Sequence, residues 1–136
     1  MDSQGQPAGQ AEHARIGPTA WAVAYRRTFF DIPYARDIFD ELKRIMQPPR
    51  LTPELAEEQA CAHDLQFEAR FRLVSQLLEE NRAKQILEIA SGFSPRGLAM
   101  THDGSVEYVE ADLPDIIKAK KEIVRKLVQE AKAPDG

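Results

Sequence analysis

The sequence predicts an α/β protein in which several helices precede a parallel β-α-β-α arrangement. Two short runs of strand-forming residues, Ile86–Ile89 and Val106–Val109, alternate with helix-like segments in the second half of the chain. The first half carries apolar residues at helical spacing. Strands that alternate with helices usually pair in parallel through a right-handed crossover, so we expect a small parallel sheet.

Length and composition indicate one soluble domain. The chain has 136 residues, of which 43% are hydrophobic and 29% are charged, and no apolar run reaches the roughly 18 residues of a membrane helix. The net charge of -4 argues against a general nucleic-acid binder, which needs a basic surface. Cys61 is the only cysteine, which excludes an internal disulfide and favours the reducing cytoplasm.

The first half of the chain divides into a tail and a helical segment. Residues 1–17 are rich in Gln, Gly, Ala and Pro and predict a disordered tail. The helical segment, residues 18–81, contains predicted helices over about 20–27 and 34–46. A third begins at Thr52, an N-cap followed by proline, and continues to Asn81, which we expect to close it in a left-handed conformation.

Residues 82–136 contain the predicted strands and the turn that follows the first of them. That strand runs into the small-residue turn Ala90-Ser91-Gly92, after which Pro95 opens a short helix. In open α/β sheets a cofactor binds at such a turn. The carboxyl end of the strand, the bare backbone of the turn and the positive end of the next helix all meet there.

A long helix follows the second strand and begins at Leu113-Pro114-Asp115. It has an apolar stripe on one side. Its basic residues are interrupted by acids, and we interpret them as a solvated face. They are Lys118, Lys120, Lys121, Arg125 and Lys126.

Gly92 and Asp112 together indicate an adenosine-containing cofactor. Asp112 lies 20 residues after Gly92, the spacing at which an acid at the end of the next strand accepts hydrogen bonds from ribose hydroxyls. The same layout serves NAD, FAD and S-adenosylmethionine, but the loop matches only the second glycine of the dinucleotide motif. The alternative is structural: Gly92 serves the turn alone and Asp112 caps the helix that begins near Pro114.

Four stretches resemble class I S-adenosylmethionine-dependent methyltransferases of the leucine carboxyl methyltransferase type, which include O-methyltransferases related to polyketide biosynthesis. Their order and spacing carry the resemblance, which covers the chain from about residue 18 to its end. The stretches are Pro18–Arg26, Ala69–Leu78, Leu87–Arg96 and Val109–Pro114.

The resemblance implies a role for several residues. Arg70 matches the arginine that holds the methionyl carboxylate of the cofactor, and Glu88 matches an acid that orients the loop. Ala90, Ser91 and Gly92 match the backbone that passes under the cofactor, although the family usually has glycine in place of Ala90. Asp112 matches the ribose-binding acid.

The resemblance also implies a Rossmann-like methyltransferase sheet and an in-line methyl transfer to a carboxylate or hydroxyl oxygen of a small-molecule acceptor. It assigns no catalytic residue. His13, His63 and His102 form no ligand pattern with Cys61, so we expect no metal site. Family members have about seven strands. We therefore expect this chain to be the N-terminal part of such an enzyme, with weak or no cofactor binding by itself.

Two other functions fit the pattern. A two-stranded parallel sheet leaves two unpaired edges, so the chain could be a non-catalytic interaction module or a split-protein half that pairs with another chain or a second copy. A nicotinamide-binding oxidoreductase fragment is the third hypothesis.

Overall fold

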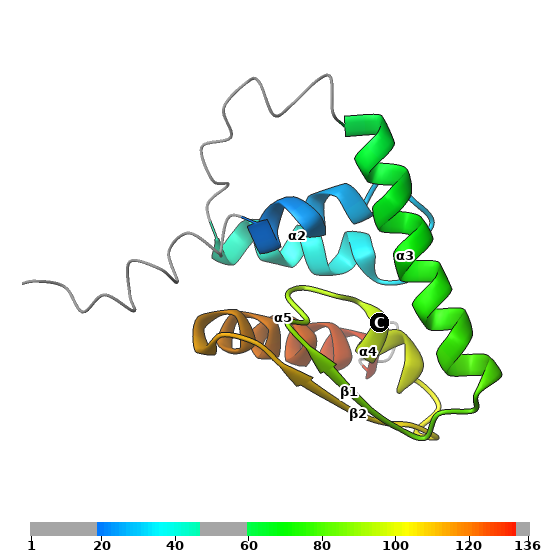
Figure 1. Cartoon of the computed structure of the whole chain (residues 1–136). Helices are drawn as coiled ribbons and strands as arrows, with labels where there is room; N and C mark the ends of the chain where they lie inside the picture. The colour runs from blue at the N-terminus through cyan, green and yellow to red at the C-terminus, as the bar shows by residue number, and fades with distance from the viewer. Residues whose placement is uncertain (1–18, 47–59, 133–136) are drawn as a thin grey trace, which may run out of the picture.

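The computed structural model describes residues 19–46 and 60–132 (Figure 1). Residues 19–27 are helical, and the other helices are α2 (Ala35–Ile45), α3 (Ala60–Glu80), α4 (Arg96–Met100) and α5 (Pro114–Lys132). The strands are β1 (Gln85–Ile89) and β2 (Glu107–Ala111). The predicted tail at residues 1–17 and the predicted helix start at Thr52 lie outside the described residues.

The two strands pair in parallel, which confirms the predicted α/β class with a β-α-β unit. The register runs from Gln85 opposite Glu107 to Ile89 opposite Ala111, and α4 lies in the connection between the strands. One further backbone bond, from the N–H of Ser91 to the carbonyl of Ala111 at 3.3 Å, extends the ladder past the end of β1. The turn after β1 is therefore attached to the end of β2.

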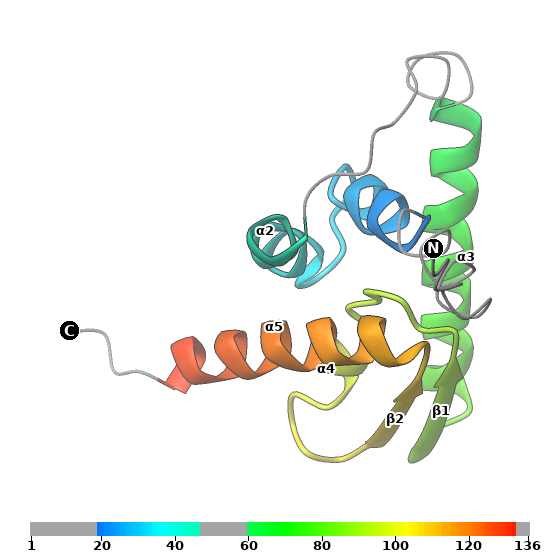
Figure 2. The same ribbon diagram turned by 90° about the vertical axis from the view of Figure 1, so that its left-hand side faces the viewer.

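The described helices cover one face of this sheet and leave the other bare. Exposure alternates along both strands: Glu88 and Glu110 lie on the covered face, and Leu87, Ile89 and Val109 lie on the open one. Figure 2 shows α4 and most of α5 to the left of the two strands, and α3 at their right, beside β1. One layer of the three expected for a doubly wound α/β domain is therefore absent from the described residues.

The hydrophobic core lies among helix 19–27, α2, α5 and the loop after β1. Ile38 and Leu42 are one turn apart on α2 and are at most 1% exposed. Phe93, in the loop, is 2% exposed and belongs to the same cluster as Trp21 and Ile123. Burial of Phe93 fixes the loop against the core.

The end of α3 differs from the prediction by one residue. Arg82, with a φ of 51°, adopts the left-handed conformation, and the N–H of Ala83 donates to the carbonyl of Leu78 at 3.0 Å. This is the pattern of a Schellman cap. Asn81 directly follows the helix and donates from its side-chain amide to the carbonyl of Leu77 at 2.7 Å, but it is not left-handed, so that part of the prediction was wrong.

Candidate functional site

The turn after β1 contains two left-handed residues. Ala90 has a φ of 55° and Gly92 a φ of 52°. A Cβ at Gly92 would lie 3.8 Å from the Cβ of Ala20, an ordinary contact, so glycine is required there by the backbone conformation and not by space. Ala90 adopts the same conformation at a cost of roughly 1–2 kcal/mol.

Asp112 binds this turn directly, at the carboxyl end of the neighbouring strand. The backbone N–H of Gly92 donates to Oδ2 of Asp112 at 2.6 Å, and the N–H of Leu113 donates to Oδ1 at 2.7 Å. One carboxylate therefore joins the turn to the segment that begins α5. Asp112 is half-buried, and each of its oxygens retains a lone pair that can accept a hydroxyl from a ligand.

Two buried polar atoms belong to this region and lack partners among the described residues. They are Oγ of Ser91 and Nε1 of Trp21; the residues are 4% and 7% exposed. Ser91 therefore turns its side chain inward while its neighbour Ala90 is exposed. Buried groups of this kind usually bind water or a ligand.

Glu88 and Arg96 join the two ends of the loop. Nη1 of Arg96 donates to Oε1 of Glu88 at 2.5 Å, and its Nε donates to Oγ of Ser75 at 3.2 Å. The guanidinium also lies over the ring of Phe71, 4.5 Å from its centroid. Tyr108 donates its hydroxyl to the other oxygen of Glu88 at 2.8 Å. Because Glu88 is in β1 and Arg96 is in α4, this pair holds the loop closed.

The surroundings of this pair shift two further pKa values. Burial lowers the pKa of Arg27 to about 10, with the charge of Glu88 opposing the shift and that of Arg96 adding to it. Burial, the hydrogen bond to Glu88 and its charge raise the pKa of Tyr108. Glu88 thus interacts with Arg96 of α4, with Tyr108 of β2 and with the charge of Arg27.

A second buried ion pair corrects the interpretation of the basic residues on α5. Lys120 is 4% exposed and donates to Oε1 of Glu110 at 2.5 Å. Burial lowers the pKa of Lys120, while Glu110 opposes the shift. Nζ of Lys126 donates to Oε2 of Glu41, a residue of α2, at 2.7 Å. Lys120 is therefore not part of a solvated face; Lys118 is exposed as predicted.

Arg70 is not joined to this cluster by any described contact. Its side chain is exposed on α3 and makes no hydrogen bond, ion pair or ring contact with the described residues. The arginines that interact with Glu88 are Arg96 and Arg27, which the sequence reasoning did not single out. These two arginines could not be predicted from the sequence, because their contacts join separate helices and strands and produce no periodic pattern.

Residues 19–46 and 60–132 contain no group of three His, Cys, Asp or Glu side chains that could hold a metal ion. In the same ranges, no helix is long and apolar enough to cross a bilayer. Comparison of the chain with protein-family models, curated proteins and solved structures finds no match. A functional proposal therefore depends on the geometry of the turn and its acid.

Proposed function

We propose that the turn Ala90–Gly92 and Asp112 form part of an S-adenosylmethionine site, and that the protein transfers a methyl group to a carboxylate or hydroxyl of a small molecule. The observation that carries the proposal is the bond from Gly92 N–H to Asp112. It brings a glycine turn and an acid together at the carboxyl ends of adjacent parallel strands, where ligands of α/β sheets bind.

The residues present fit a nucleoside cofactor in part. The free lone pairs of Asp112 would accept ribose hydroxyls, and the exposed backbone at Ala90 would allow close approach. The guanidinium of Arg70 is exposed, and it would bind the methionyl carboxylate of the cofactor. When bound, the cofactor would supply a methyl group activated by its sulfonium. The chain's own residues would orient it.

Titration with S-adenosylhomocysteine, followed by amide chemical shifts, tests this proposal. We expect shifts concentrated at Ala90–Gly92 and Asp112, with a dissociation constant of about a millimolar, because two strands supply only part of a pocket. NADH should leave these amides unchanged. Absence of shifts at saturating ligand, or equal shifts with NADH, would contradict the assignment.

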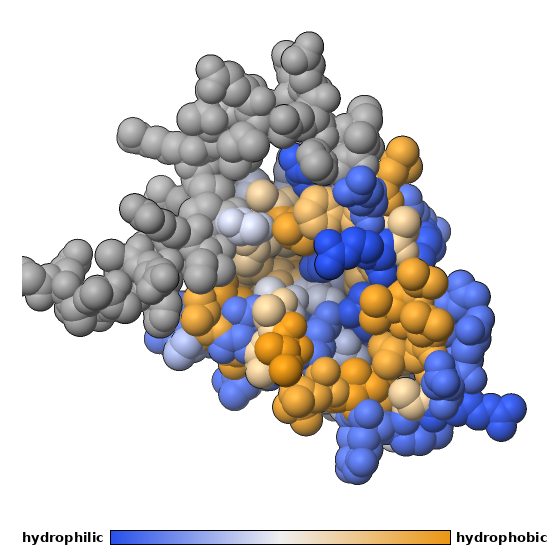
Figure 3. Space-filling model, viewed as in Figure 1, coloured by the Kyte–Doolittle hydropathy of each residue, from blue (hydrophilic) through white to orange (hydrophobic). Residues whose placement is uncertain are grey.

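A second function is favoured by one observation, the bare apolar face of the sheet. Leu87, Ile89 and Val109 are 62%, 75% and 59% exposed, and Leu73 and Leu77 of α3 are 56% and 47% exposed. Figure 3 shows hydrophobic surface across the region where Figure 1 draws the strands and the lower part of α3. Such a surface is typical of an interface. We propose self-association or strand exchange with another chain as the alternative.

Sedimentation over a range of concentrations distinguishes this alternative. A self-associating chain should show a mass that rises with concentration, and Ile89→Lys should abolish the rise. Leu65→Lys, at a leucine of α3 that is 64% exposed, is the matched control. A monomer at all concentrations would count against self-association.

A further inference from the structure

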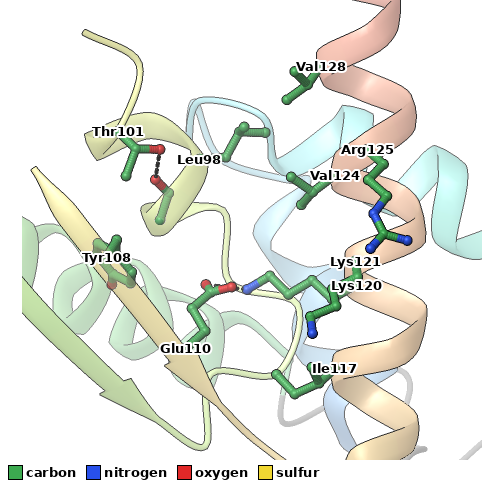
Figure 4. A pocket seen from close by; sticks show the side chains of 11 residues that line it. Leu98, Thr101, Tyr108, Glu110, Ile117, Lys120, Lys121, Val124, Arg125 and Val128 are labelled. Atoms are coloured by element: carbon green, nitrogen blue, oxygen red, sulfur yellow. Dashed lines mark hydrogen bonds and ion pairs between the residues drawn. The ribbon is translucent and has the colours of Figure 1, made fainter. Parts of the chain in front are cut away.

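A cavity of about 410 Å³ lies between α4, β2 and α5 (Figure 4). Its volume falls within the range of roughly 300–1,000 Å³ that is usual for small-molecule pockets. Its lining includes neither Asp112 nor the turn after β1, so it is separate from the proposed cofactor site. The apolar side chains around it are Leu98, Ile117, Val124 and Val128.

Most polar groups that line the cavity are already satisfied. Thr101 donates its hydroxyl to the carbonyl of Gly97 at 2.7 Å, and Tyr108 donates to Glu88. Glu110 is bound by Lys120, whose ammonium points to it in Figure 4, so this pair adds no net charge. A ligand would therefore find few hydrogen-bonding partners within the cavity.

Lys121 and Arg125 differ from the other polar lining residues. Both are exposed, and neither makes a hydrogen bond or ion pair with the described residues. They lie four residues apart on α5, a spacing at which like charges repel one another and destabilise a helix. A bound anion would remove that repulsion.

We propose that this cavity binds a small amphipathic anion, namely a carboxylate on an aliphatic chain. Its apolar body would lie against Leu98, Val124 and Val128, and its carboxylate would bind Lys121 and Arg125 at the rim. Apolar walls with two cations that have no ion-pair partner in the part of the chain that the structure describes favour this class of ligand over a sugar or a nucleotide, which need more hydrogen-bonding partners.

Titration with octanoate, followed by amide chemical shifts, tests the proposal on the intact chain. We expect saturable shifts in α4 and α5 for octanoate and much weaker binding of octanol. The double variant Lys121→Gln/Arg125→Gln should bind octanoate about tenfold more weakly, because each exposed cation contributes modestly. Both substitutions are at exposed positions, and circular dichroism checks the fold.

The matched control is Lys84→Gln/Lys118→Gln, which removes the same charge at exposed positions outside the cavity. This variant should bind octanoate as the wild type does. Absence of saturable octanoate binding would overturn the proposal. Equal binding of octanol, or an equal loss of affinity in the control, would overturn the role of the two cations.

Discussion

The backbone N–H of Gly92 donates to Oδ2 of Asp112 at 2.6 Å, although the two residues are 20 positions apart. Both oxygens of this carboxylate accept backbone N–H groups, from Gly92 and from Leu113. Asp112 therefore has a structural role in the turn as well as the ligand-binding role that we propose. The two roles are separable by experiment.

Asp112→Asn should destabilise the fold. Asparagine offers one acceptor oxygen in place of two, so one of the two backbone N–H groups loses its partner, at a cost of about 1–2 kcal/mol. Urea unfolding measures the change. Asp115→Asn is the control, because Asp115 is exposed in the first turn of α5. Equal stability of both variants would contradict the structural role.

Glu88→Gln should be more costly, because it leaves the buried guanidinium of Arg96 opposite a neutral group. We expect a loss of about 2–3 kcal/mol in the free energy of unfolding. Glu68→Gln breaks the exposed pair of Glu68 with Arg72 and should cost about 0.5 kcal/mol or less. If the two variants had similar stability, the pair of Glu88 and Arg96 would not hold the loop.

Lys120→Met should destabilise the chain by about 3 kcal/mol, because Glu110 would lose its cation on the covered face of the sheet. Lys118→Met, at an exposed position on the same helix, should change stability by about 0.5 kcal/mol or less. Thermal and urea unfolding of both variants provide the test. If Lys120→Met left the free energy of unfolding unchanged, the ion pair with Glu110 would make no net contribution to stability.

Ala90→Gly should stabilise the protein by about 0.5–1 kcal/mol, because glycine adopts a φ of 55° without strain. The same change at Ala99, within α4, should instead cost about 1 kcal/mol. Opposite signs of the two effects are the expected result. A destabilising Ala90→Gly would indicate that the methyl group of Ala90 makes a contact that outweighs the strain.

The raised pKa of Tyr108 predicts a loss of stability at alkaline pH. Near the ordinary value of 10.0 the unfolded chain releases the phenol proton while the folded chain keeps it. The folded state then binds more protons, so its stability falls as pH rises, by up to about 1.4 kcal/mol per pH unit. Tyr108→Phe should remove this contribution. Identical slopes of stability against pH above about 9 in the two proteins would contradict the shift.

The helices and strands were predictable because their signals are local. The strand Gln85–Ile89 and the turn after it follow from β-propensity and small residues, and the parallel pairing follows from the order of elements. The burial of Lys120 could also be predicted from its position in the sequence. Lys120 shares the apolar stripe of α5 with Ile116 and Ile123, at positions i, i+4 and i+7, and both isoleucines are at most 4% exposed.

The orientation of the strands was not predictable in the same way. Alternation along β1 would direct Leu87 and Ile89 into a core and Glu88 outward, but the structure covers Glu88 and exposes the two apolar residues. Strands of parallel sheets are apolar on both faces, so their pattern does not say which face the helices cover. The partners of Glu88 come from other elements, and only the folded chain brings them together.

The affinity for S-adenosylhomocysteine, compared between the wild type, Asp112→Asn and Asp115→Asn, tests the central claim most directly. Measurements are made at a temperature where circular dichroism shows each protein to be folded. We expect Asp112→Asn to bind about tenfold more weakly and Asp115→Asn to bind as the wild type does. Equal affinity of all three proteins, or no binding to the wild type, would contradict the proposal that Asp112 holds the ribose of a cofactor.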